Sequence, residues 1–97
     1  MIAVCFCDWG GGTLDVEKEL GIEEEADGFL LRRIPGLCLE ASDCLSDTED
    51  NVIYWFSAHD EELSCAAIRR ILDPLMSGRT RMQCAVKLVS GFTYGDT

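Results

Sequence analysis

Several features that would indicate a membrane, secreted or metal-binding protein are missing from this sequence. Its apolar runs are short, with the stretch at 52–56 among the longest, and none has the length needed to cross a bilayer. No basic residue precedes the first apolar run, at 2–7, so the N-terminus does not resemble a secretory signal. We therefore expect a cytoplasmic protein that makes no contact with a membrane.

Metal-binding patterns are scarce as well. Histidine occurs only at His59, and no two cysteines have the C-x-x-C spacing typical of a structural zinc site. The six cysteines are Cys5, Cys7, Cys38, Cys44, Cys65 and Cys84. Because no secretory signal is seen, we interpret them as free thiols acting as small buried hydrophobes and not as a disulfide framework. We expect no metal and no cofactor.

Basic residues are few in the first two thirds of the chain. Residues 1–62 hold sixteen acids and three bases, whereas residues 63–97 hold two acids and five bases, within a total net charge of −10. The acidic part would repel phosphates, so direct binding of nucleic acid is not expected. A strongly acidic surface instead favours a basic partner, or it serves solubility alone.

The sequence does contain enough apolar residues for a folded core. Of its 97 residues 47% are hydrophobic, so we expect one folded domain over residues 1–97 and not a disordered segment. A chain of this length supports one core. We expect it to be a monomer or a small homo-oligomer.

Periodicity and turn residues predict seven elements. The predicted strands cover 2–9, 29–34, 37–41, 51–57 and 82–89, and the predicted helices cover about 14–20 and 57–73. The order β-α-β-β-β-α-β indicates an α+β fold with two layers, in which a mixed or antiparallel sheet of four to five strands carries two helices on one face. If one of the middle strands is an edge addition, the remainder is the ferredoxin-like βαββαβ pattern.

Local signals define the first helix and the turn that follows the second predicted strand. Thr13 or Asp15 can cap the helix, and Gly21 is a suitable left-handed residue to end it. Pro35-Gly36 fits the centre of a type II turn, because proline presets φ at the first central position and glycine accepts the positive φ of the second. We therefore predict a hairpin between the second and third strands.

The second helix has an expected start, an apolar face and an expected end. Ser57 and Asp60 form a capping-box pattern at its start, and Pro74 is expected to end or kink it. Six apolar residues fall on one face at 100° per residue. They are Leu63, Ala67, Ile68, Ile71, Leu72 and Leu75.

One local stretch, residues 8–16, resembles a known chemical motif. It matches the phosphate-binding hairpin of the actin-like ATPases at Asp8, Gly10, Gly11, Gly12, Thr13, Asp15 and Val16. The resemblance implies that the glycines bring backbone N–H groups to a phosphate, that Thr13 donates its hydroxyl and that Asp8 holds Mg²⁺ through water. The match covers nine residues, and each lobe of that family's fold is larger than this whole chain. Unlike the family, whose chain continues as a strand, this chain continues with a predicted helix, so a tight strand-to-helix turn explains the glycines better.

Three acidic clusters are the main functional indication. The candidate partner-binding residues are Glu23, Glu24, Glu25 and Asp27 in the first cluster, Asp43, Asp47, Glu49 and Asp50 in the second, and Asp60, Glu61 and Glu62 in the third. All three fall at loops or element ends, where carboxylates can be exposed together. Because duplex DNA carries one charge per ~1.7 Å of its axis, a surface dense in carboxylates can imitate DNA to a basic groove.

In size, compactness and acidity the chain resembles phage anti-CRISPR proteins, small single domains that occupy the DNA-binding surface of a CRISPR effector. This resemblance of kind implies an inhibitor whose partner is a basic protein or ribonucleoprotein complex that handles nucleic acid. Immunity proteins that neutralise basic nuclease toxins share the same profile and are the first alternative.

A catalytic protein is the alternative from another class. It would be a small nucleotide-binding enzyme that uses Asp8–Thr13, or a thiol enzyme in which His59 lies beside Cys5 or Cys65. No carboxylate lies within an apolar run in a way that would mark it as a buried general acid. We therefore assign no catalytic residue and expect a binding protein.

Overall fold

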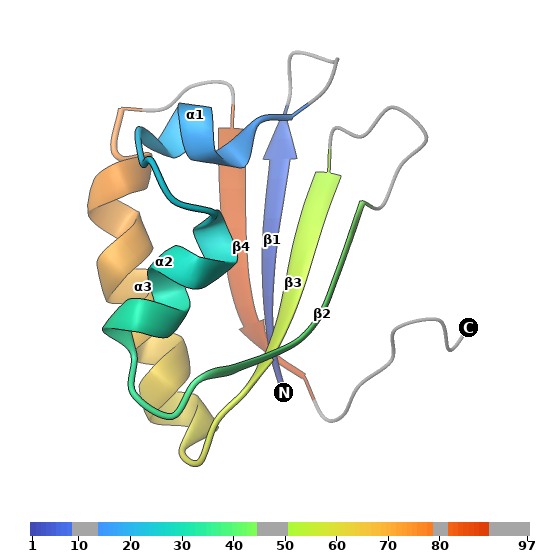
Figure 1. The fold of residues 1–97 in the computed structure, drawn as a ribbon, viewed down its shortest axis with the longest axis vertical. Helices are drawn as coiled ribbons and strands as arrows, with labels where there is room; N and C mark the ends of the chain where they lie inside the picture. Colours follow the sequence, from blue (N-terminus) through green and yellow to red (C-terminus); the bar gives the residue numbers. More distant parts are fainter. Residues whose placement is uncertain (9–13, 45–50, 79–81, 90–97) are drawn as a thin grey trace.

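The computed structural model describes residues 1–8, 14–44, 51–78 and 82–89, which form three helices and four strands (Figure 1). The elements follow the order β1 (Ile2–Asp8), α1 (Val16–Leu20), α2 (Ala26–Arg33), β2 (Cys38–Cys44), β3 (Asn51–Ser57), α3 (Glu61–Met76) and β4 (Met82–Leu88). The prediction of an α+β fold is confirmed. No helix in these ranges is long and apolar enough to span a membrane.

The four strands form one sheet in the order β2-β3-β1-β4. Each neighbouring pair is antiparallel, with Val4 of β1 opposite Tyr54 of β3 on one side and opposite Val86 of β4 on the other. The predicted strands at 2–9, 37–41, 51–57 and 82–89 all correspond to strands of this sheet. The strands at 2–9, 51–57 and 82–89 were recognisable because β-branched, aromatic and sulfur-containing residues recur in them, whereas the one at 37–41 was inferred from the turn before it.

The predicted strand at 29–34 is wrong, because these residues belong mostly to helix α2. Ala26, Leu30 and Ile34 recur at intervals of four residues and are all buried, which is the period of a helix facing a core. Arg32 and Arg33 occupy the last turn, where positive charge interacts favourably with the helix dipole. The apolar run Phe29 to Leu31 hides this period when it is considered alone.

The Pro35-Gly36 turn is present, but it does not join two strands. The N–H of Leu37 donates to the carbonyl of Ile34 at 3.3 Å, and Gly36 has φ +81°, as the second central position of a type II turn requires. The predicted hairpin is therefore wrong, because the turn connects α2 to β2.

Helix α1 forms as its capping residues predict. Asp15 accepts a hydrogen bond from the N–H of Lys18 at 3.1 Å, and Gly21, at φ +74°, ends the helix in the left-handed conformation. The carboxylate of Glu17 then accepts the N–H of Ala26 at 2.9 Å. A side chain of α1 thereby caps the start of α2 and sets the direction in which the chain continues.

Helix α3 begins later and ends later than its sequence signals suggest. Its N-cap is Asp60, which accepts from the N–H of Leu63 at 3.0 Å, so the capping box with Ser57 is wrong. Ser57 ends β3, and its hydroxyl donates to Glu40 at 2.6 Å. Pro74 does not end the helix, which continues to Met76. Proline has no N–H to donate to the carbonyl four residues before it, so the helix loses one hydrogen bond, but the N–H of Ser77 still closes the last turn on the carbonyl of Asp73.

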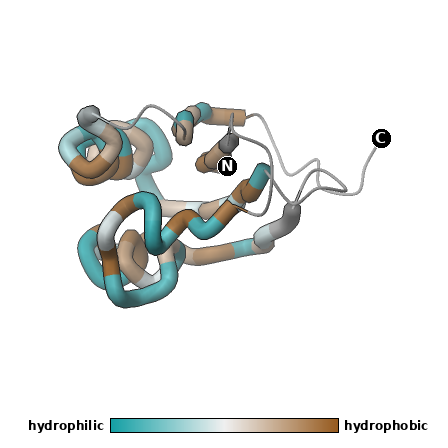
Figure 2. The backbone as a smooth tube through the Cα atoms, turned by 90° about the horizontal axis from the view of Figure 1, so that it is seen from above, coloured by the Kyte–Doolittle hydropathy of each residue, from teal (hydrophilic) through white to brown (hydrophobic). Residues whose placement is uncertain are grey.

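All three helices lie on one side of the sheet (Figures 1 and 2). The main core lies between them and the sheet and includes Ile2, Val4 and Phe6 of β1, which are fully buried. A smaller buried cluster contains Ala3, Ile53 and Trp55, whose positions on the strands alternate with those of the main core.

Two glycine substitutions test the corrected assignment of α2. Gly28 lies within the helix and an added Cβ would meet no atom within 4 Å, so Gly28→Ala should raise the free energy of unfolding by about 0.5 kcal/mol. Gly36 also has open space, but its positive φ strains any residue with a Cβ, so Gly36→Ala should lower the free energy of unfolding by about 1–2 kcal/mol. Urea unfolding measures both values. A destabilising Gly28→Ala would contradict the helix.

Candidate functional site

The turn between α1 and α2 gathers carboxylates that have no partner. Glu23 and Glu25 are exposed in this turn, while Glu19 in α1 and Asp27 in the first turn of α2 are half-buried. Among the described residues, none of the four side chains makes an ion pair or a hydrogen bond. We name these four residues the acidic turn. Sequence reasoning omitted Glu19, although its spacing of four residues from Glu23 was a usable signal.

Glu24 lies in the same turn but serves the fold. Its carboxylate oxygens pair with Arg32 at 2.8 Å and with Arg33 at 3.0 Å, and Arg33 also lies 3.6 Å from the centre of the Phe29 ring. Desolvation acts to raise the pKa of Glu24, but the hydrogen bonds and charges of Arg33 and Arg32 outweigh it and hold this pKa below its usual value. Glu24 thus neutralises the nearest arginines internally and leaves the acidic turn without a counter-charge from them.

The cluster at the start of α3 is mostly engaged in the fold. Asp60 caps the helix and Glu61 pairs with the ammonium group of Met1, while Glu62 is exposed. In Figure 1, α3 begins at the end of the molecule where β1 starts, whereas α1 lies at the end where β1 finishes. A partner that contacts both Glu62 and the acidic turn must therefore extend along the helical side of the protein.

Most of the second predicted cluster lies outside the described residues. Asp43 is placed on β2, opposite Ile53 of β3, whereas Asp47, Glu49 and Asp50 belong to the range 45–50, which is not described. That this cluster is exposed together with the other two stays a prediction.

The stretch that resembles a phosphate-binding hairpin is described only at its ends. Asp8 ends β1, residues 9–13 lie outside the described ranges, and Asp15 is engaged as the N-cap of α1. The chain after Val16 forms a helix, as the sequence predicted and unlike the resembling family. His59, the other catalytic candidate, is exposed immediately before the N-cap of α3.

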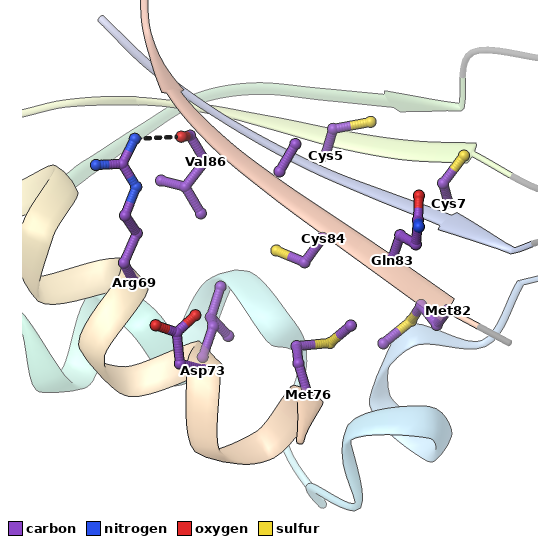
Figure 3. A pocket seen from close by; sticks show the side chains of 11 residues that line it. Cys5, Cys7, Arg69, Asp73, Met76, Met82, Gln83, Cys84 and Val86 are labelled. Atoms are coloured by element: carbon purple, nitrogen blue, oxygen red, sulfur yellow. Dashed lines mark hydrogen bonds between the residues drawn. The ribbon is translucent and has the colours of Figure 1, made fainter. Parts of the chain in front are cut away.

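A hollow of about 640 Å³ lies along β4 (Figure 3). Cys84 of β4 lines it together with Arg69 and Asp73 of α3, whereas Cys5 and Cys7 of β1 lie at its edge and point to the other side of the sheet. The thiol of Cys7 donates to the side-chain oxygen of Asn51. No group of three or more metal-ligating side chains is found among the described residues.

The electrostatics of this hollow do not favour a thiol nucleophile. Burial, together with the neighbouring Cys5 and Asp73, raises the pKa of Cys84 from 9.0 to about 12. Burial and the nearby Cys7 also raise the pKa of Cys5, against an opposing contribution from Lys87. Both thiols therefore stay protonated at neutral pH. His59, which could activate a thiol, does not line the hollow.

Alkylation kinetics test this assignment. Because the thiolate is the reactive form, Cys84 should react with iodoacetamide roughly a thousandfold more slowly at pH 8 than a thiol with a pKa of 9.0. Its rate should rise about tenfold per pH unit up to about pH 12. Exposed Cys38 is the internal control, and peptide mass spectrometry follows both residues. Equal rates at Cys84 and Cys38 would show that the Cys84 thiolate is accessible.

Comparison with protein-family models, with curated proteins and with solved structures finds no match for this chain.

Proposed function

We propose that this protein is an inhibitor that binds the basic nucleic-acid-binding surface of a partner through the acidic turn. The partner would be a basic protein or a ribonucleoprotein complex that handles nucleic acid, as for anti-CRISPR proteins. The proposal is supported above all by the four unpaired carboxylates of the acidic turn, Glu19, Glu23, Glu25 and Asp27. The same observation supports an immunity protein against a basic nuclease, which would present a similar surface.

Electrostatics explains what such a surface can do. A DNA duplex carries one phosphate charge per ~1.7 Å of its axis. Several adjacent carboxylates can therefore compete with DNA for the arginines and lysines of a binding groove. The long-range attraction also speeds encounter, by about tenfold or more at low salt. A protein that works in this way needs no catalytic residue and no cofactor.

The structure of the turn holds these carboxylates in place before a partner arrives. Gly21 ends α1 sharply, Glu17 caps α2, and Glu24 binds both arginines at the far end of the same helix. Because the backbone is fixed by these contacts, a partner does not have to order it on binding. Preorganised charge of this kind increases affinity without new contacts.

We also propose a specific fold type and a cellular location for the protein. The antiparallel order β2-β3-β1-β4, with α1 and α2 between β1 and β2 and α3 between β3 and β4, supports a two-layer, ferredoxin-like arrangement. We place its action in the cytoplasm, where nucleic-acid-handling complexes are found.

Charge neutralisation tests the proposed surface. Glu23→Gln with Glu25→Gln should lower the rate of association with the partner by about tenfold at low salt and much less at high salt. The measurement is displacement of fluorescein-labelled target DNA from purified guide-loaded CRISPR effectors, and from a basic nuclease domain for the alternative. Glu40→Gln with Asp73→Asn removes the same charge from exposed positions outside the three acidic clusters and should change the rate by less than about twofold. Equal losses in the two double variants would contradict a specific acidic turn.

Thermal unfolding with Mg-ATP separates this proposal from a nucleotide-binding enzyme. Because a ligand that binds only the folded state raises the melting temperature, an inhibitor without a nucleotide site should show no shift. Thr13→Ala, which removes the hydroxyl of the resembling motif, is the matched variant. A shift that appears with Mg-ATP and is lost in Thr13→Ala would support the enzyme instead.

A further inference from the structure

Helix α3 has apolar residues outside the face that packs against the sheet. Cys65, Ile68 and Leu72 are buried against the sheet, whereas Leu63, on the neighbouring stripe of the helix, is 67% exposed. Leu63 had been predicted on the buried face together with Ala67 and Ile71. The structure rotates the helix so that these three residues form a second apolar stripe beside the core.

This second stripe lines a groove between α3 and the end of α2. The groove has a volume of about 310 Å³, and its opposite wall is formed by Ile34 and Pro35, where α2 turns toward β2. Leu63, Ala67 and Ile71 lie four residues apart, so they face the groove one turn after another. A groove of this size admits one bulky apolar side chain of another molecule.

Two arginines line the same groove, and one of them has no partner. Arg33 is held by Glu24 and by the ring of Phe29, so its charge is largely satisfied. Arg70 is exposed and makes no ion pair or hydrogen bond with any residue in the described ranges. In a chain of net charge −10, this position offers a free positive charge beside an apolar groove.

We propose that the groove between α2 and α3 docks an acidic peptide segment that carries one bulky apolar side chain. The side chain enters between Pro35 and Leu63, and a neighbouring carboxylate of the segment pairs with Arg70. This occupant matches both the apolar walls and the free charge. A nucleic acid matches the charge of Arg70 but not the apolar walls. The site is separate from the acidic turn, which prefers a basic partner, so either surface can fail its test alone.

Fluorescence anisotropy tests the groove with a defined probe. The probe is a fluorescein-labelled synthetic peptide with one central leucine flanked by glutamates, and its comparators replace the leucine by alanine or the glutamates by lysines. Each comparator should bind the protein at least about fivefold more weakly than the probe. Binding of the lysine peptide as tightly as the probe would overturn the proposal, and so would absence of saturable binding.

Variants of the protein locate the bound probe. Arg70→Glu should weaken binding by about tenfold, and Leu63→Ala by about fivefold, because both side chains lie at the surface and contribute little to folding. Lys87→Glu and Leu88→Ala make the same changes on the exposed part of β4 and should alter binding by less than about twofold. Amide shifts in NMR spectra should move at Ala67 and Ile71. Equal effects of the control variants would overturn the assignment.

Two further measurements identify a different occupant. Sedimentation equilibrium that shows a dimer, lost in Arg70→Glu, would mean that the groove holds a second copy of this chain. A single-stranded oligonucleotide that displaces the probe at a lower concentration than unlabelled peptide would mean a nucleic-acid site. Either result overturns the proposal of an acidic peptide. The proposal is supported if the protein is monomeric and the oligonucleotide does not displace the probe.

Discussion

Burial of one side of β1 is the constraint on which the rest of the structure depends. Ile2, Val4 and Phe6 are fully covered, and β1 is paired on both edges, by β3 and by β4. Apolar burial of this kind stabilises by roughly 25 cal/mol for each Å² removed from water, so the helices have to cover this side of the sheet. Helix α3 does so with Ile68 and Leu72, and the shorter helices complete the cover.

The carboxylates fall into two groups once the helices are in place. Asp15, Glu17, Glu24, Asp60 and Glu61 each have a defined role as a cap or as an ion-pair partner. The acidic turn has none of these roles, although it lies in the same part of the chain. Net charge by itself does not separate the two groups. Side-chain contacts separate them. Asp15 and Asp60 accept backbone N–H groups as N-caps, whereas Glu25, at the N-cap position of α2, makes no capping hydrogen bond. Glu17 accepts the N–H of Ala26 instead.

Local chemistry made some of these features predictable from sequence and left others out of reach. Asp15 and Gly21 define α1 within a few residues of chain, and the turn at Pro35-Gly36 follows from proline and glycine alone. Helix α2 could not be recognised in the same way, because it depends on contacts eight or nine residues away, such as Glu17 with Ala26. For the same reason, sequence indicated the exposed acids of the acidic turn but not that Glu24 would be withdrawn from them. The groove beside Arg70 depends on how α3 is rotated, which only packing decides.

The hydrogen bond between Arg69 and the carbonyl of Val86 has a consequence for how the sheet ends. β4 is an edge strand, and the guanidinium donates to this carbonyl at 2.7 Å from the adjacent helix. Unpaired backbone groups on an edge strand are a template on which other chains can add, and proteins commonly block them with charged side chains. A strand from a neighbouring molecule would have to displace Arg69 before it could pair at Val86. The arginine that lines the hollow along β4 therefore also covers part of the open edge of the sheet.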